Sequence, residues 1–141
     1  MSLLPLNDFP LRTYDKIRYA DTDRQGHVNN AVFATFLETG RVECLYSPDL
    51  PLLAAGASFV IVSLNLTLSA ELRWPGTVEI GTGVLKTGTS SIHLYQQLFQ
   101  HGKPAAHAET VIVQVGPGGQ SAPLTESARN LLSQWLLPAR S

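Results

Sequence analysis

Residues 29–45, NNAVFATFLETGRVECL, decide the fold, because apolar and small side chains recur there at the three-and-four spacing of one helical face. Asn29 and Asn30 are residue types that accept the free N–H groups of a helix start, and Pro48 follows the pattern. We therefore predict a long helix that begins near Asn29 and buries its apolar face in the core. The positions on that face are Val32, Phe33, Phe36, Leu37, Gly40, Cys44 and Leu45.

Strand patterns lie on both sides of this helix. Residues 13–20 interleave Tyr and Ile with charged residues, which indicates a short strand with an exposed side. Residues 59–69 alternate apolar and polar side chains, so Val60, Val62 and the leucines that follow should face the core. We predict that four strands meander as antiparallel hairpins and wrap the long helix, which makes the fold class α+β. The remaining elements are strands at 77–86, 91–100 and 105–115 and a short amphipathic helix within 124–136.

The composition fits one globular domain over residues 1–141 and argues against several partners. The chain has 141 residues, 44% of them hydrophobic, which one ordinary core accounts for. Lysines and arginines number 10 against 11 acids, so no net basic field exists to hold nucleic acid or an anionic membrane. The longest apolar runs are far shorter than a membrane span, and the first residues lack the pattern of a signal peptide. We expect a cytoplasmic protein.

The segment between the first strand and the long helix carries the candidate chemistry. It reads RYADTDRQGHVNN over residues 18–30. The segment resembles the signature of the hot-dog-fold acyl-CoA thioesterases of the 4-hydroxybenzoyl-CoA thioesterase type, in which Asp-x-Asp-x-x-Gly-x-Val-x-x opens the central helix. The similarity continues through residues 31–41 and returns at 88–91 and 109–111. The resemblance implies a five-stranded antiparallel sheet around one central helix, with a short C-terminal helix.

The resemblance also implies roles for individual residues. The family's catalytic carboxylate carries over to Asp23, and a more structural aspartate matches Asp21. The backbone N–H of Asn30 matches the group that polarises the substrate carbonyl. The implied reaction is hydrolysis of an acyl-CoA, or alternatively of an acyl-carrier-protein thioester, without a cofactor or a metal.

Three departures from the family pattern concern the substrate. Phe33 stands where many members have tyrosine, Thr39 and Gly40 replace a commoner acid and alanine, and Asn30 replaces a histidine of some subgroups. The sequence His-Val-Asn-Asn at 27–30 resembles the branch that acts on fatty acyl thioesters. These differences bear on the substrate class more than on the activity.

Thioester chemistry agrees with this interpretation on physical grounds. A thiolate leaving group has a pKa of about 8.5, so neither a metal nor a strong general acid is required. Free N–H groups at a helix start, together with the helix dipole, can stabilise the developing negative oxygen. Asp23 could attack the carbonyl as a nucleophile or activate a water as a general base.

Each residue of the segment also has a structural interpretation. We favour a turn or cap role for Asp21, and we disfavour it for Asp23 because of the motif around it. His27 either positions substrate or adjusts Asp23, or it only forms a local hydrogen bond. Asn29 and Asn30 are expected to cap the helix, which is compatible with oxyanion binding by a backbone N–H.

Other polar residues are weaker candidates. Glu38 is an alternative carboxylate on the central helix, although a pair with Arg41 at three-residue spacing is the simpler interpretation. The single cysteine, Cys44, lies on the apolar face and is expected to be a core residue in a reducing compartment. We assign the substrate-binding surface to Asn29, Phe33, Lys86, Thr89, Ser90 and Ser91, where the last four would meet a CoA phosphate or pantetheine.

Two other functions share the expected fold. A hydratase or dehydratase needs an aspartate and histidine pair on a different loop, which residues 23–30 fit poorly. A non-catalytic acyl-thioester binder would keep the motif only as a helix cap.

The expected sheet also predicts an oligomer. A curled sheet leaves strand edges that symmetric pairing would cover, so we expect a homodimer or homotetramer with the acyl site at the subunit boundary.

Overall fold

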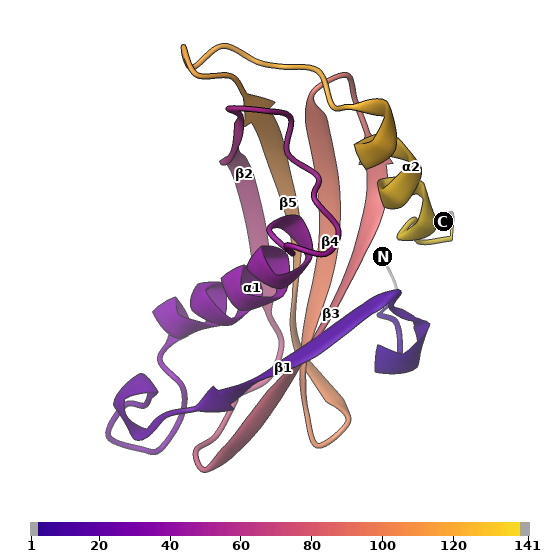
Figure 1. The fold of residues 1–141 in the computed structure, drawn as a ribbon. Helices are drawn as coiled ribbons and strands as arrows, with labels where there is room; N and C mark the ends of the chain where they lie inside the picture. The colour runs from indigo at the N-terminus through magenta and orange to yellow at the C-terminus, as the bar shows by residue number, and fades with distance from the viewer. Residues whose placement is uncertain (1–2, 139–141) are drawn as a thin grey trace.

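The computed structural model describes residues 3–138, in which an antiparallel sheet of five strands curls around one long helix (Figure 1). This is the architecture expected from the sequence. The elements in chain order are η1 (Leu6–Asp8), β1 (Leu11–Ile17), η2 (Tyr19–Asp21), α1 (Asn30–Leu45), β2 (Ser58–Leu68), β3 (Gly76–Thr87), β4 (Ser91–Gln100), β5 (Lys103–Val115) and α2 (Glu126–Gln134).

The strand order in the sheet is β1-β3-β4-β5-β2, which corrects the predicted meander in one respect. Strands β3, β4 and β5 do meander, but β2 pairs with β5 and not with its sequence neighbour β3. The reason is that β1 already pairs with the free edge of β3, with Leu11 opposite Thr82 and Ile17 opposite Gly76. Strands β1 and β2 are therefore the two edges of the sheet.

Helix α1 begins and ends where the apolar pattern predicts. The Asn29 side chain caps it by accepting a hydrogen bond from the Ala31 N–H at 3.0 Å. Of the positions expected to be buried, all are buried except Val32, which is partly buried. Arg41 is also buried, which the pattern did not predict.

The predicted first strand is wrong at both ends. Strand β1 covers Leu11–Ile17, and Tyr19–Asp21 form a 3₁₀ turn in place of the last strand residues. The cause is local, because the Asp21 carboxylate accepts a hydrogen bond from the Arg18 N–H at 2.8 Å and so bends the chain back.

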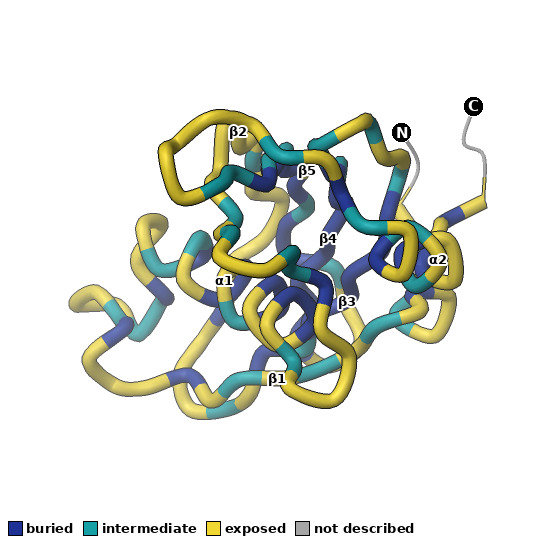
Figure 2. Tube along the Cα trace, turned by 45° about the horizontal axis from the view of Figure 1, so that its top comes forward, coloured by how far each residue is buried: buried dark blue, intermediate teal, exposed yellow. Residues whose placement is uncertain are grey.

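Strand β2 departs from the predicted alternation because a bulge lies between Ile61 and Ser63. Before the bulge Ile61 lies opposite the buried Ile112, and after it Leu64 lies opposite the buried Thr110. Val60 and Val62, which were expected in the core, therefore do not share the inner face, and Val62 is 59% exposed. In Figure 2 most of β2 is exposed, whereas β3 and β4 are largely buried.

Buried glutamines tie neighbouring segments to the sheet through paired hydrogen bonds. The Gln100 amide accepts from the Arg73 N–H at 2.9 Å and donates to the Arg73 carbonyl at 2.8 Å. Gln97 holds the N–H and carbonyl of Leu4 in the same way. A side-chain amide satisfies a buried backbone donor and acceptor together, as a paired strand would. These two hydrogen bonds between Gln100 and Arg73, called the Gln100 clamp below, are important for the site because they fix the segment that pairs with the loop before α1.

Two clusters of buried side chains fill the interior along α1. One surrounds Phe33, Phe36 and Leu37, and the other surrounds Cys44 and Leu45 and includes α2. Each half of α1 is thus packed against the concave face of the sheet. Within residues 3–138, no helix has the length and apolar content needed to cross a membrane.

Candidate active site

The loop between β1 and α1 is held by Asp21. This carboxylate is 2% exposed and forms an ion pair with Arg18 at 2.8 Å. Burial raises the pKa of Asp21, but the hydrogen bonds from the Arg18 side chain and N–H outweigh it, so the pKa lies below its ordinary value. The Asp21 carbonyl also accepts from the Asn29 N–H at 2.8 Å, which joins the loop to the helix start. Asp21 therefore has the structural role predicted for it.

Asp23 lies in the exposed tip of this loop. Its Oδ1 accepts hydrogen bonds from the Gln25 N–H at 2.8 Å and from the His27 N–H at 3.2 Å. Its Oδ2 has no hydrogen-bond partner among the described residues. One carboxylate oxygen therefore shapes the turn, while the other is available to a ligand or a water.

His27 faces Glu71 across the loop. Its Nδ1 lies 3.1 Å from Glu71 Oε1, and Glu71 Oε2 lies 3.1 Å from Arg73 Nη2. The backbones of His27 and Arg73 form an isolated antiparallel bridge, and the Val28 N–H donates to the Leu72 carbonyl at 2.8 Å. The segment that Gln100 clamps thus fixes the histidine beside Asp23.

The start of α1 supplies a free backbone donor. The Ala31 N–H binds the Asn29 side chain and the Val32 N–H binds the Asn29 carbonyl, but within residues 3–138 no acceptor binds the Asn30 N–H. Such a donor at the positive end of a helix dipole attracts negative charge. Asn29 is thus a cap, as predicted, and the Asn30 N–H is available to a substrate oxygen.

A cleft of about 290 Å³ brings the predicted catalytic residues together. Asp23, His27 and Asn30 line it, and so does Phe33 from the first turns of α1. Nearby Asn29 is exposed and serves as the helix cap. The complete lining is Asp23, His27, Val28, Asn30, Phe33, Leu68, Ser69, Ala70 and Glu71.

The predicted CoA-binding hairpin does not join this cleft within one chain. Lys86, at the end of β3, and Thr89, Ser90 and Ser91 lie at the β3–β4 hairpin, whereas the cleft residues Ser69, Ala70 and Glu71 precede the start of β3. The two ends of β3 are far apart in Figure 1. The eleven steps from Gly76 to Thr87 correspond to about 36 Å of strand. The Thr89 carbonyl accepts hydrogen bonds from Arg129 and from the Leu124 N–H, so the turn is packed against the segment that leads into α2.

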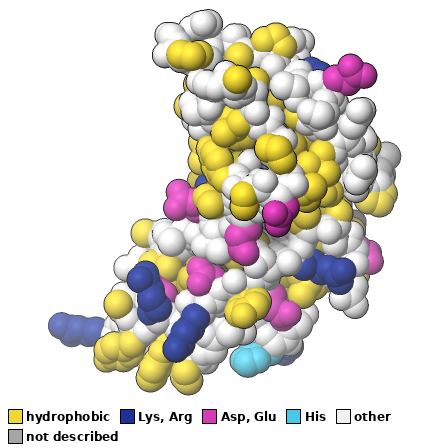
Figure 3. All heavy atoms as spheres, in the orientation of Figure 1, with side chains coloured by type: hydrophobic (Ala, Val, Ile, Leu, Met, Phe, Trp, Pro, Cys, Tyr) yellow, Lys and Arg dark blue, Asp and Glu magenta, His cyan; other side chains and the backbone are white. Residues whose placement is uncertain are grey.

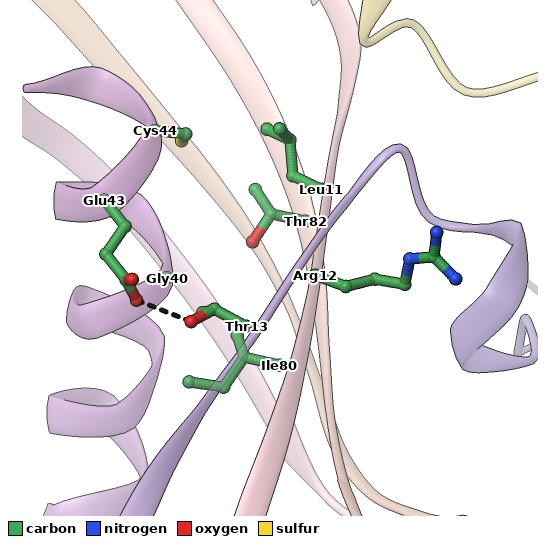
Figure 4. Close-up of a pocket in the computed structure, with 8 residues that line it drawn as sticks. All are labelled: Leu11, Arg12, Thr13, Gly40, Glu43, Cys44, Ile80 and Thr82. Carbon is green, nitrogen blue, oxygen red and sulfur yellow. Dashed lines mark hydrogen bonds between the residues drawn. The ribbon is translucent and has the colours of Figure 1, made fainter. Parts of the chain in front are cut away.

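A second cavity, of about 190 Å³, lies on the opposite flank of α1, beside β1 (Figure 4). Thr13 donates to Glu43 across its mouth at 2.8 Å, while Arg12 points away toward Asn7. Cys44 also lines it, and burial raises the pKa of its thiol to about 12. A thiol with so high a pKa is not a nucleophile at neutral pH, so Cys44 is a core residue as expected.

Sequence reasoning did not find the residues that close the cleft from the β2 side. Glu71 contacts His27 only because the chain folds back after β2, and no local pattern marks it. Ser69 and Ala70 line the cleft for the same reason. Within residues 3–138, no three His, Cys, Asp or Glu side chains gather as possible metal ligands.

One family model matches most of this chain. It describes the thioesterase-like superfamily and matches residues 17–135, which include the loop and the whole of α1. The chain belongs to the thioesterase-like superfamily. Membership confirms the thioesterase resemblance at the level of the superfamily. Among curated proteins, none matches this sequence.

Solved structures agree with this membership. A thioesterase from Thermus thermophilus, complexed with coenzyme A and Zn, is 29% identical; the match covers 89% of this chain and 92% of that one, with a TM-score of 0.76. A predicted thioesterase from Bacillus stearothermophilus is 25% identical over 92% of this chain and 98% of its own, with a TM-score of 0.80. The PA5185 protein from Pseudomonas aeruginosa is 23% identical over 96% and 98%, with a TM-score of 0.85. These likenesses confirm the hot-dog thioesterase fold.

Proposed function

We propose that this protein is an acyl-CoA thioesterase in which Asp23 acts on the thioester carbonyl. The observation that carries the proposal is that Asp23 and Asn30 line one cleft, and that the Asn30 N–H has no acceptor within residues 3–138. The superfamily match covers both of them. When the leaving group is good, a carboxylate and a preorganised N–H donor are sufficient catalytic groups for acyl transfer.

Two mechanisms of hydrolysis are compatible with this position of Asp23. In the first, the free oxygen of Asp23 attacks the carbonyl carbon, the CoA thiolate leaves, and water hydrolyses the mixed anhydride to the free acid. In the second, Asp23 takes a proton from a water that attacks the carbonyl. In both, the Asn30 N–H stabilises the negative oxygen of the tetrahedral intermediate, and the thiolate takes its proton from solvent.

His27 has a positioning role in this proposal. Its Nδ1 faces Glu71 at 3.1 Å and its own N–H holds the Asp23 carboxylate at 3.2 Å, so it links the fixed segment of the loop to the reacting group. The other ring nitrogen is then free to meet substrate. Phe33 provides the apolar wall beside the carbonyl site.

Coenzyme A is the carrier that the relatives favour. The Thermus thermophilus thioesterase, 29% identical to this chain, is complexed with coenzyme A. Basic side chains gather toward the lower left of Figure 3, the end where Figure 1 has the loop before α1. Three arginines belong to that end, namely Arg18, Arg24 and Arg73, and they offer phosphate contacts as an alternative to the β3–β4 hairpin.

We further propose a homodimer, alone or within a homotetramer, formed at the β2 edge. Val60, Ile61, Val62, Leu64 and Leu68 of this strand are between 40% and 59% exposed. An edge strand with so much exposed apolar surface is an aggregation hazard unless another strand covers it. Antiparallel pairing of β2 with its own copy would cover it by a closed two-fold contact.

The test of the function is release of free thiol from a panel of acyl-CoAs of different chain length, with enoyl hydration measured in parallel. We expect thiol release on at least one acyl-CoA. Hydration without thiol release would identify a hydratase. Tight binding of acyl-CoA without turnover would identify a non-catalytic binder. Activity only on acyl-carrier-protein thioesters would identify a different acyl carrier. Each of these results would contradict the proposal.

A further inference from the structure

Arg41 is the only buried arginine among residues 3–138, with 5% of its surface exposed. Its Nη1 donates to Gln96 Oε1 at 3.5 Å, which is at the limit of a hydrogen bond. None of the ion pairs of the described residues includes it. The active-site chemistry does not use this residue, so its burial has another cause.

A buried guanidinium without a counterion is unfavourable for a single folded chain. Arginine remains charged throughout the pH range of proteins, and a charge out of water needs an opposite charge or several strong hydrogen bonds. Burial lowers the pKa of Arg41, and the nearby charge of Glu38 acts in the opposite direction. No carboxylate among residues 3–138 forms an ion pair with Arg41, so an anion from outside the chain would stabilise its guanidinium.

The guanidinium lines a groove of about 160 Å³ on the β2 flank of α1. Glu38, one helical turn earlier, lines the same groove and is exposed. The charge of Glu38 raises the pKa of Arg41, yet the two side chains do not form an ion pair. The opposite wall is Phe59 and Ile61, in the first half of β2.

The position of this groove determines what a second copy would present to it. Antiparallel pairing of two β2 strands places a two-fold axis on that strand, and pairing centred near Ile61 would put this axis beside Glu38 and Arg41 of α1. Both α1 helices then lie on the same side of the joined sheet and run in opposite directions. In such an isologous contact, if residue 38 of one copy faces residue 41 of the other, the reverse holds as well.

We propose that Arg41 pairs with Glu38 of the partner subunit, so that two symmetric ion pairs lock the dimer next to its two-fold axis. This inference rests on the β2-edge dimer of the proposed function and adds the groups that specify it. Each chain brings one acid and one base on the same helix flank, so the contact is self-complementary. A polar pair within an otherwise apolar interface also sets the register of the two copies.

Charge reversal provides a direct test. In a homodimer of Glu38→Arg, each Arg41 meets a second cation, and in a homodimer of Arg41→Glu, each Glu38 meets a second anion. We expect sedimentation equilibrium to show dimer dissociation constants raised at least about tenfold for each variant alone. When the two variants are mixed, both contacts pair opposite charges, and native mass spectrometry should detect a heterodimer with near wild-type affinity.

Controls separate this proposal from its alternatives. Glu43→Arg adds the same charge on the other flank of α1 and should leave the dimer unchanged. If Arg41→Glu does not fold, Arg41→Met and Glu38→Gln should show non-additive effects on dimer affinity in a double-mutant cycle.

Three results would overturn the ion pair or its basis. Charge-reversed variants that dimerise as tightly as the wild type would refute the pair while leaving the dimer standing. An unchanged dimer together with an altered preference for acyl-CoAs that end in a carboxylate would assign Arg41 to the substrate instead. A monomeric wild type would refute the dimer itself, independently of the thiol-release assay.

Discussion

Gly40 allows α1 to approach the sheet, and Gly40→Ala tests how tightly the two are packed. A Cβ at this position would lie 2.7 Å from Gln96 Nε2, 2.7 Å from Ile80 Cγ2 and 3.1 Å from Thr82 Oγ1. The Gln96 amide cannot move aside freely, because it donates to the Leu37 carbonyl and to Thr82 Oγ1, each at 3.0 Å. The backbone or the buried amide must shift.

Gly40→Ala has two opposing effects on the free energy of unfolding, and the destabilising effect is the larger. Alanine in a helix interior is more favourable than glycine by about 1 kcal/mol. Overpacking a close-packed interior costs about 1–3 kcal/mol, and the contact with a fixed hydrogen-bonded amide belongs at the upper end. We therefore expect Gly40→Ala to lower the free energy of unfolding by about 1–2 kcal/mol, which corresponds to roughly 3–8 °C in Tm.

Urea and thermal unfolding followed by circular dichroism measure this change. Thr35→Ala is the matched control, because it improves helix propensity at an exposed position of the same helix and should be neutral or slightly stabilising. If Gly40→Ala were as stable as the wild type, the helix and the sheet would not be packed as closely as described.

Two further outcomes are expected. Lys86→Ala should raise KM for acyl-CoA more than it lowers kcat if the β3–β4 hairpin binds a CoA phosphate, and an unchanged KM at low ionic strength would move phosphate recognition to the arginines near the cleft. The pKa of Asp21 is lower in the folded than in the unfolded chain, so its pair with Arg18 contributes stability above the ordinary aspartate pKa, which is lost as the pH falls. Arg18→Met should therefore begin to unfold at a higher pH than the wild type in urea titrations between pH 3 and pH 7; identical acid profiles would exclude this contribution.

Local patterns predicted most of the fold because its elements follow from the nearby sequence. The periodicity of α1 and its cap at Asn29 identify the helix, and the turn at Gly88 identifies the β3–β4 hairpin. In the folded chain β1 occupies the edge of β3 and β2 pairs with β5, and no local signal in the sequence predicts that pairing. The bulge after Ile61 is a feature of the pairing with β5, so strict alternation fails there, and Ile61 and Leu64 lie opposite the buried Ile112 and Thr110.

The candidate site was predictable where its residues are contiguous in sequence. Asp23, His27 and Asn30 come from one loop and one helix start, and they line one cleft. Glu71 and the burial of Arg41 were not predictable, because both result from segments distant in the sequence that meet only in the folded chain. For Arg41, the three-residue spacing to Glu38 favoured an ordinary pair within the helix, and the structure contains no such pair.

The most direct measurement of the central claim is the rate of thiol release by Asp23→Asn. Asparagine keeps the oxygen that accepts from the Gln25 and His27 N–H groups, so the loop should hold its shape while the carboxylate is lost. Asp49→Asn removes a carboxylate from an exposed position away from the cleft and is the control. We predict that Asp23→Asn, folded and with unchanged oligomeric state, loses on the order of a hundred-fold or more in kcat, while Asp49→Asn retains wild-type activity. Near-normal thiol release by a folded Asp23→Asn protein would contradict the account and make Glu38 the next carboxylate to test.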